Sequence, residues 1–248
     1  MIPSAEVQAL NRRFQTESTE KVLAWAWERF GARGAIGTSF QGAGLVIIHL
    51  AKQNRLAFPV FTLDTGVLFE ETIALKQRLE DFFGCRIEAA EPDLTVQQQT
   101  TAYGSELWKR DPDLCCTVRK VLPLQNRLAQ LDCWITGLRR QQADTRLETN
   151  IVEVYAFAET KDIVKLNPLA NWPRDAVWKY IRDHKIPYNP LPDQGYRSIG
   201  CRPCTAKSAG GENAYLYDAG NLALFWSALA ATAWCAVTAV RVRSLRLG

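Results

Sequence analysis

Residues 60–66, with the sequence VFTLDTG, decide the fold class. The apolar run 60–63 predicts a buried strand, and the following Asp-Thr-Gly predicts a turn into an amphipathic helix near residues 68–83. A similar unit precedes it, with a strand at 35–39, a turn at 41–44 and a helix over 45–52. Two such units in succession indicate a repeating strand–helix arrangement.

The pattern continues along the chain. It predicts further strands at 85–89, 133–136 and 151–157, polar helical material up to Leu107, a helix from about 115 to 130, and a helix from Pro173 to near His184. Strands separated by helices of this length predict an α/β fold, a parallel sheet with helices on both faces. Ligands of such sheets bind at the carboxyl ends of the strands, so the turns after Ser39 and Leu63 are the places to look for chemistry.

Length and charge restrict the function classes. The chain has 248 residues, a formal net charge of +4 and no lysine- or arginine-rich block before residue 240. This length suffices for one principal domain, and the charge gives no reason to expect a nucleic-acid partner, although small anionic ligands suit it. Residues 1–14 lack the charged and apolar regions of a secretory signal, so we expect a reducing cytosol in which cysteines stay as thiols or bind metal.

Four of the seven cysteines form two close pairs, Cys115-Cys116 and Cys201-x-x-Cys204. Four thiolates brought together from two places are the ligand set of an iron-sulfur cluster or a structural zinc. Adjacent cysteines have Cα atoms about 3.8 Å apart, so both sulfurs of the first pair can reach one cluster from a helix start. Zinc generally uses two CxxC-like pairs, so we rank the cluster first, zinc second and a disulfide between adjacent cysteines last.

The other cysteines and the histidines have simpler interpretations. Cys85 and Cys133 begin apolar strands and are predicted to be small core residues. His49 lies on an apolar helix face and His184 near a helix end, so both are predicted to pack or to cap. With only two histidines in the chain, a histidine-rich metal site is excluded.

Five signatures occur in the order of one known family, and they are specific in combination rather than singly. They are residues 39–41 (SFQ), 63–66 (LDTG), 115–120 (CCTVRK), 136–142 (TGLRRQQ) and 186–205 (IPYNPLPDQGYRSIGCRPCT). From roughly residue 28 to residue 205, the chain resembles the assimilatory adenylylsulfate and phosphoadenylylsulfate reductases. The resemblance implies an adenine nucleotide α-hydrolase-like sheet.

The resemblance also implies a reaction. An enzyme thiolate attacks the sulfur of adenylylsulfate and expels AMP, and thioredoxin or glutaredoxin then releases sulfite from the S-sulfocysteine. One four-iron four-sulfur cluster, not redox-active in this scheme, is held by Cys115, Cys116, Cys201 and Cys204. Family members with both cysteine pairs look like adenylylsulfate users, whereas users of the 3′-phosphorylated substrate usually lack them. We therefore expect cytoplasmic, assimilatory reduction of adenylylsulfate, without nucleic acid or membrane as partner.

Candidate substrate residues follow from the strand ends. Ser39 and Gln41 sit where a strand opens into a helix, so backbone N–H groups and the helix dipole can receive the sulfo-phosphate. The alternative is a plain turn with a helix cap. Leu63, Asp64 and Gly66, at the next strand end, are expected to meet adenine and ribose.

Cationic candidates lie on two further segments. Gly137 closes the strand at 133–136, and the arginines that follow it supply the cations that phosphate and sulfate oxygens attract: Arg139, Arg140 and Arg146. Lys120, one helical turn beyond Cys116, could bring positive charge near both cluster and sulfate. The alternatives are surface arginines and a solvated helix lysine.

The C-terminal part departs from the family. We assign residues 1–205 to the reductase domain and residues 206–248 to a divergent tail. Active members carry Glu-Cys-Gly-x-His after the second cysteine pair, with the nucleophile in that motif, but this chain has no histidine after His184. Cys235 is the only thiol there, and its apolar neighbours favour the protonated form. The catalytic residue is therefore unassigned.

Several interpretations of the tail and of the function remain open. Residues 222–240 carry no formal charge and precede three arginines. A shifted reading frame at the 3′ end of the gene ranks first, a buried or interface helix second and a membrane span third. Besides a reductase of adenylylsulfate, the chain could be a reductase of 3′-phosphoadenylylsulfate, or a nucleotide- and cluster-binding homologue without turnover. An ATP pyrophosphatase of the same fold family would need a Ser-Gly-Gly-x-Asp-Ser loop, which residues 39–44 do not supply.

Overall fold

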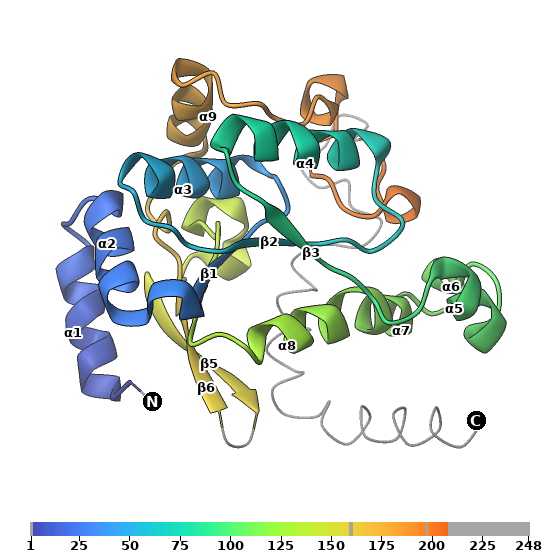
Figure 1. The fold of residues 1–248 in the computed structure, drawn as a ribbon, viewed down its shortest axis with the longest axis horizontal. Helices are drawn as coiled ribbons and strands as arrows, with labels where there is room; N and C mark the ends of the chain where they lie inside the picture. Colours follow the sequence, from blue (N-terminus) through green and yellow to red (C-terminus); the bar gives the residue numbers. More distant parts are fainter. Residues whose placement is uncertain (1, 159–160, 197, 208–248) are drawn as a thin grey trace.

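A central sheet organises the molecule (Figure 1). The computed structural model describes residues 2–158, 161–196 and 198–207, and within these ranges six strands form one sheet in the order β3-β2-β1-β4-β6-β5. All neighbouring strands are parallel except β5 and β6. The strands are β1 (Gly34–Gly37), β2 (Val60–Leu63), β3 (Ile87–Ala90), β4 (Cys133–Ile135), β5 (Val152–Ala158) and β6 (Lys161–Leu166).

The strand order places a switch point beside β1. The chain adds β2 and β3 on one side of β1 and then crosses to add β4 on the other side. In register, Ile36 of β1 lies between Val60 of β2 and Ile135 of β4. Open α/β sheets bind ligands beyond the carboxyl ends of the strands at such a switch point.

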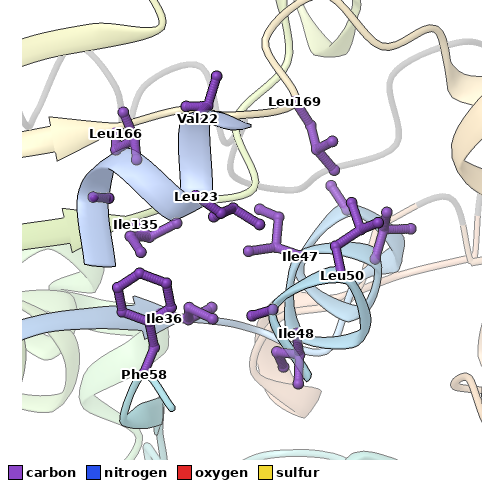
Figure 2. Close-up of a cluster of buried hydrophobic side chains, with 14 of the residues drawn as sticks. Val22, Leu23, Ile36, Ile47, Ile48, Leu50, Phe58, Ile135, Leu166 and Leu169 are labelled. Atoms are coloured by element: carbon purple, nitrogen blue, oxygen red, sulfur yellow. The ribbon is translucent and has the colours of Figure 1, made fainter. Parts of the chain in front are cut away.

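The larger hydrophobic core lies between the sheet and a group of helices on one face. Figure 2 shows part of it, with Leu23 and Ile47 reaching from two helices toward Ile36 of the sheet. α3 is buried along most of its length because its sequence, AGLVIIHLA over residues 43–51, is apolar almost all round. The helices that contribute to this core are α1 (Ser4–Phe14), α2 (Thr19–Phe30), α3 (Gly42–Gln53), α4 (Glu70–Phe83) and α9 (Arg174–Asp183).

A smaller core covers the opposite face. Leu124 and Leu128 of α8 pack there against Ala35 and Phe61 of the sheet. Shorter helices lead to α8 along the chain, and in Figure 1 α5 and α6 lie at the far end of this row from the sheet. The elements are α5 (Val96–Tyr103), α6 (Leu107–Arg110), α7 (Pro112–Cys116), a π-helical turn (Thr117–Val121) and α8 (Leu122–Leu128). Single 3₁₀ turns cover Gly31–Arg33, Arg140–Gln142, Asp144–Arg146, Leu191–Gln194 and Arg202–Cys204.

The predicted fold class is confirmed with four differences. The sheet is mostly rather than wholly parallel, because β6, which the sequence did not predict, pairs antiparallel with β5. The helix expected from residue 45 already begins at Gly42, so the predicted turn at 41–44 is wrong over most of its length. The helix expected over 115–130 is interrupted by the π-helical turn. The N-terminal helices α1 and α2 had no counterpart among the sequence predictions.

Close packing explains the glycines at the start of α3. A Cβ on Gly44 would lie 2.3 Å from the Thr38 hydroxyl, and one on Gly42 would lie 3.0 Å from Val177. These glycines therefore let α3 approach its neighbours rather than mark a turn.

The residues predicted to be structural pack as expected. Cys133 is fully buried in β4, and Cys85 is half-buried against the larger core. His49 lies with its Nδ1 2.9 Å from the Tyr180 hydroxyl. His184 is the C-cap of α9, with its ring centroid 4.7 Å from that of His49.

No helix in the described part of the chain combines the length and the apolar character needed to cross a membrane. The uncharged run 222–240 and Cys235 lie outside the described residues, so the three interpretations of the tail stay predictions.

Glu80 ties α4 to the start of β3. Its Oε1 accepts hydrogen bonds from Lys76 Nζ at 3.0 Å and from the Ile87 backbone N–H at 2.7 Å. Burial raises the pKa of Glu80, but these donors and Arg86 outweigh burial, and the pKa falls below its ordinary value of 4.5. A lowered pKa in the folded state means that the stabilisation is present above the ordinary value and is lost as pH falls through the folded one.

Glu80→Gln should therefore lower the free energy of unfolding at neutral pH by about 1–2 kcal/mol, because charged hydrogen bonds are replaced by weaker neutral ones. The difference from wild type should shrink in acid, since the wild-type carboxyl is then protonated. Urea unfolding at neutral pH and in acid, below the folded-state pKa of Glu80, measures the free energy of unfolding of both proteins. Glu91→Gln, at an exposed position, is the control and should change the free energy by less than about 0.5 kcal/mol. An equal deficit at both pH values would contradict the charge argument.

Candidate active site at the carboxyl edge of the sheet

Three loops leave the sheet at the same edge. They follow β1, β2 and β4, which are neighbours in the sheet and parallel. The loops carry residues 38–41, 64–66 and 136–139 respectively, and they contain six of the eight predicted substrate residues: Ser39, Gln41, Asp64, Gly66, Gly137 and Arg139. Leu63 ends β2 directly before the second loop, and only Lys120 comes from elsewhere. A Cβ on Gly137 would lie 3.0 Å from the backbone nitrogen of Gly44, so the β4 loop closely approaches the first turn of α3.

The loop after β1 has an unusual backbone. Phe40 is buried with φ of 58°, a region that non-glycine residues rarely adopt, and its N–H donates to the Thr38 hydroxyl at 2.9 Å. Such strain clusters at functional sites. Ser39 and Gln41 flank it, both exposed, and no side chain of the described residues caps α3. The backbone N–H groups of this turn therefore face a position where an anion can bind.

The loop after β2 requires a glycine. Asp64 Oδ1 accepts from the Gly66 N–H at 2.9 Å, and Gly66 has φ of 70°. A Cβ on Gly66 would also lie 2.8 Å from the guanidinium of Arg119. The positive φ would strain any other residue at this position, and its Cβ would force the Arg119 guanidinium to shift.

The second cysteine pair is attached to this same loop. Leu68 and Cys201 form an isolated antiparallel bridge, and the Arg202 N–H donates to the Val67 carbonyl at 2.8 Å. The Cys201 thiol lies 3.3 Å from the Thr65 hydroxyl. In addition, Gln41 Nε2 donates to the Ile199 carbonyl at 3.2 Å, which connects the loop after β1 to the segment before the cysteines.

The first cysteine pair ends α7. Pro112 occupies the first turn of that helix and Asp111 caps it by accepting from the Leu114 N–H at 3.0 Å. The π-helical turn follows directly and carries Arg119 and Lys120. π-Helical turns within α-helices are rare and frequent at functional sites. Lys120 acts on Cys116 at the end of α7: burial raises the pKa of that thiol, and the nearby ammonium opposes the rise.

The four thiols of the two pairs interact electrostatically. Burial, followed by the charges of the other three cysteines, raises the pKa of Cys115 to about 11. Burial also raises the pKa of Cys116 and of Cys204. Burial lowers the pKa of Lys120, but all four cysteines act against it and the net shift is upward. The two pairs and Lys120 thus form one local charge system, although their parent segments are far apart in the sequence.

This donor set suits an iron-sulfur cluster, because it offers four soft sulfur ligands with a cation and hydrogen-bond donors beside them. Among residues 2–158, 161–196 and 198–207, no three His, Cys, Asp or Glu side chains are arranged to hold a single metal ion. The thiols therefore share an electrostatic environment without forming a ready-made site for one ion.

Three polar residues around the cysteines were not among the sequence predictions. Arg119 is buried, donates through Nε to the Thr65 carbonyl and through Nη1 to Gln99 Oε1 at 3.0 Å. Gln99 Nε2 lies 3.9 Å from Cys115 Sγ. Burial lowers the pKa of Arg119, whereas the charges of Cys115, Cys201 and Asp64 act to raise it. The guanidinium is therefore part of the same charge system.

The arginines after β4 divide into different roles. Arg139 is buried, donates through Nη1 to the Trp172 carbonyl at 3.1 Å, and has an Nε without a hydrogen-bond partner among the described residues. Burial is the main cause of the lowered pKa of Arg139, and the positive charges of Arg174 and Arg146 lower it further. Arg140 instead connects loops, donating to the Thr149 carbonyl at 2.9 Å and to Asn171. Arg139 is thus the arginine with donor capacity to spare.

With this geometry in view, comparison with known proteins identifies the family. The profile of the phosphoadenosine phosphosulfate reductase domain matches residues 34–207. The chain belongs to this reductase family. The adenosine 5′-phosphosulfate reductase of Salinibacter ruber is 41% identical over 202 residues, which are 82% of this chain and 79% of the relative. The adenosine 5′-phosphosulfate reductase 2 of Bacillus subtilis is 42% identical over 189 residues, 75% and 78% of the two chains.

Solved structures agree with the family assignment. The phosphoadenylyl-sulfate reductase from Candida auris, in a phosphate complex, superimposes with a TM-score of 0.74 and 28% identity, covering 83% of this reductase-family chain and 98% of its own. The FMN adenylyltransferase of Candida glabrata has a TM-score of 0.54 at 12% identity, covering 84% and 69%, and shares the fold alone. The predicted adenine nucleotide α-hydrolase-like architecture is therefore confirmed.

The predicted site residues of this chain lie together at the carboxyl edge of the sheet, but the role of each one stays a prediction. The signal that could have found Arg119 was present, because it precedes Lys120 in the motif after the cysteine pair. Thr65 lies within the predicted turn without having been singled out. Gln99 gave no signal, since it is the last of three consecutive glutamines and only the structure shows that it alone is buried.

Proposed function

We propose that this chain binds adenylylsulfate and reduces it to sulfite and AMP with thioredoxin or glutaredoxin as reductant, beside a four-iron four-sulfur cluster. One observation carries the proposal. The segments bearing Cys115-Cys116 and Cys201-x-x-Cys204 interact at the same sheet edge that carries Ser39, Asp64 and Gly137. Relatives that share about 40% of the sequence bear the name adenosine 5′-phosphosulfate reductase, which supports the unphosphorylated substrate.

The nucleotide would occupy the switch point of the sheet. We assign the phosphate to the backbone N–H groups at the start of α3, next to Ser39 and Gln41, because no side chain of the described residues caps that turn. Gly137 lets the loop after β4 pack directly against that turn, and the Nε of Arg139, which has no hydrogen-bond partner among the described residues, supplies a charge-assisted donor. Leu63, Asp64 and Gly66 are left to contact adenine and ribose at the end of β2.

The sulfate would face Lys120. Its ammonium is already in the charge system of the four cysteines, and its pKa is raised, so it stays protonated at neutral pH. Cys115, Cys116, Cys201 and Cys204 would hold the cluster, with Thr65 and Arg119 behind them. When bound, the cluster supplies a fixed electrostatic centre next to the sulfate. A reducing cytosol suits this chemistry because the cysteines must remain available as thiolates.

The reaction needs one further thiolate. Its sulfur bonds to the sulfur of adenylylsulfate while the bond from that sulfur to the bridging oxygen breaks, and AMP leaves with the electron pair. A thioredoxin thiolate then attacks the cysteine sulfur of the S-sulfocysteine, and sulfite leaves with the electron pair. The second thioredoxin thiol resolves the mixed disulfide, so thioredoxin is oxidised and the enzyme thiol is restored.

The described residues do not offer that thiolate outside the two pairs. Cys85 precedes β3 and Cys133 begins β4, so both lie at the amino edge of the sheet, opposite the site. Burial also raises the pKa of Cys133 strongly. Cys235 is the remaining cysteine of the sequence. The absence of a Glu-Cys-Gly-x-His motif favours a second candidate function, in which the chain binds nucleotide and cluster without turnover.

Labelled adenylylsulfate separates the two functions. The reductase predicts that anaerobic protein incubated with ³⁵S-labelled substrate acquires a covalent label on a cysteine, and that reduced thioredoxin releases this label as sulfite. Peptide mass spectrometry locates the cysteine, and Cys235→Ser should abolish the label. Saturable, reversible binding with no covalent label would contradict the reductase and support the second function. Absence of any binding would overturn both.

A further inference from the structure

Gln99 is buried beside the first cysteine pair, between Cys115 and Arg119. It lies in α5, whose first turn is fixed by a capping box: Thr95 Oγ1 accepts from the Gln98 N–H at 3.1 Å and the Gln98 side chain accepts from the Thr95 N–H at 2.8 Å. Gln99 is 1% exposed, while Gln97 and Gln98 beside it are exposed. A buried amide of this kind needs partners for both ends.

Both ends of the Gln99 amide have partners, and this fixes its orientation. Arg119 Nη1 lies 3.0 Å from Gln99 Oε1, and a guanidinium can only donate, so the amide oxygen must face it. The amide Nε2 therefore faces the opposite way, toward Cys115 Sγ at 3.9 Å. Arg119 is itself held by the Thr65 carbonyl and is 2% exposed, so it has little freedom to turn away.

We propose that Gln99 is a positioning residue for Cys115: its amide N–H aims at the Cys115 sulfur and holds this thiolate in place for the cluster, with Arg119 locking the amide. This inference rests on the proposed cluster. A thiolate lowers its energy by accepting N–H donors, and burial makes the donor more important because water cannot replace it. Outer contacts of this kind typically change the retention of a metal centre by about tenfold to a hundredfold.

Two variants distinguish positioning from simple packing. Gln99→Glu keeps an oxygen for Arg119 but removes the N–H that faces Cys115, and the guanidinium offsets the added charge. Gln99→Leu removes both contacts. Gln97→Glu, an exposed position on the same helix, is the matched control.

The readouts are the rate at which an iron chelator bleaches the visible absorption under anaerobic conditions, and the Fe–S(Cys) stretching bands in the resonance Raman spectrum. Both Gln99 variants should lose the cluster about tenfold to a hundredfold faster than wild type, with shifted Raman bands, while Gln97→Glu behaves as wild type. Circular dichroism melting of each protein shows whether Gln99→Leu is folded. If it is not, Gln99→Glu carries the test.

The inference is overturned if folded Gln99→Glu retains the wild-type bleaching rate and the wild-type Raman bands, because Arg119 alone would then account for the buried amide. This outcome leaves the proposed function intact, since it requires a wild-type protein that holds the cluster. A wild-type protein without iron would instead overturn the proposed function, and the role of Gln99 with it.

Discussion

Cys201→Ser should purify under anaerobic conditions with more than about tenfold less iron than wild type and without the brown colour of an iron-sulfur protein. Cys201 is 5% exposed and is held at one position by the bridge to Leu68 and by its contact with Thr65. A serine hydroxyl at this place is a hard, largely protonated ligand, and iron-sulfur clusters select soft thiolates. Outside the two pairs, no described cysteine lies at this edge to replace it, because Cys85 and Cys133 are at the amino edge.

Cys85→Ser is the matched control for this prediction. It makes the same chemical change at a half-buried cysteine that packs against the larger core. Its iron content should equal that of wild type. Iron is measured by colorimetric assay per folded chain, with circular dichroism to confirm the fold. Full iron in Cys201→Ser, or equal loss in both variants, would contradict the assignment of the cluster ligands.

Lys120→Met should weaken the binding of adenylylsulfate about tenfold to a hundredfold, which corresponds to one charge-assisted contact. Lys120 is half-buried in the π-helical turn. The groups that raise the pKa of its ammonium are the four cysteines rather than a surface carboxylate. Methionine keeps most of the side-chain length and removes only the ammonium. Isothermal titration calorimetry of the protein with adenylylsulfate, in the absence of thioredoxin and glutaredoxin, gives the dissociation constant directly.

Two comparisons localise the effect of Lys120→Met to the sulfate. AMP lacks the sulfate, so its affinity should change much less than that of adenylylsulfate. Lys109→Met, which removes an exposed lysine paired with Glu106, should leave both affinities unchanged. Equal weakening of AMP and adenylylsulfate by Lys120→Met would show that Lys120 acts on the nucleotide or on the fold, and would contradict its proposed position.

The parts of the fold that sequence predicts are those whose signal is local. β2 was predicted with its observed bounds because a run of four residues, three of them apolar, is followed directly by Asp-Thr-Gly. β6 was missed because the run 161–166, KDIVKL, mixes charges with apolar residues. Ile163, Val164 and Leu166 are nevertheless buried, since β6 lies between β4 and β5. That position depends on strand pairing over a long sequence distance, which periodicity does not report.

In the candidate site, too, the residues with a local sequence signal could be predicted and those that depend on distant contacts could not. The cysteine pairs could be predicted because each pair is contiguous or nearly so, and thiols in pairs have few other uses in a reducing environment. Gln99 and Thr65 could not be assigned, because their partners are far away in the sequence, as with the Thr65 carbonyl and Arg119. The motif after the first cysteine pair contained Arg119, but only the structure shows what it contacts. Arg140 shows the reverse case. Its sequence context suggests anion binding, but the structure commits its guanidinium to Thr149 and Asn171.

The central claim is that two distant cysteine pairs share one inorganic core next to a nucleotide site. Quantifying iron, acid-labile sulfide and zinc in anaerobically purified wild-type protein, together with its Mössbauer spectrum, tests this claim most directly. The account predicts equal iron and sulfide in the ratio of a four-iron four-sulfur cluster, one cluster per chain, with negligible zinc. A folded protein that contains zinc in place of iron, or no metal and no sulfide, would contradict it.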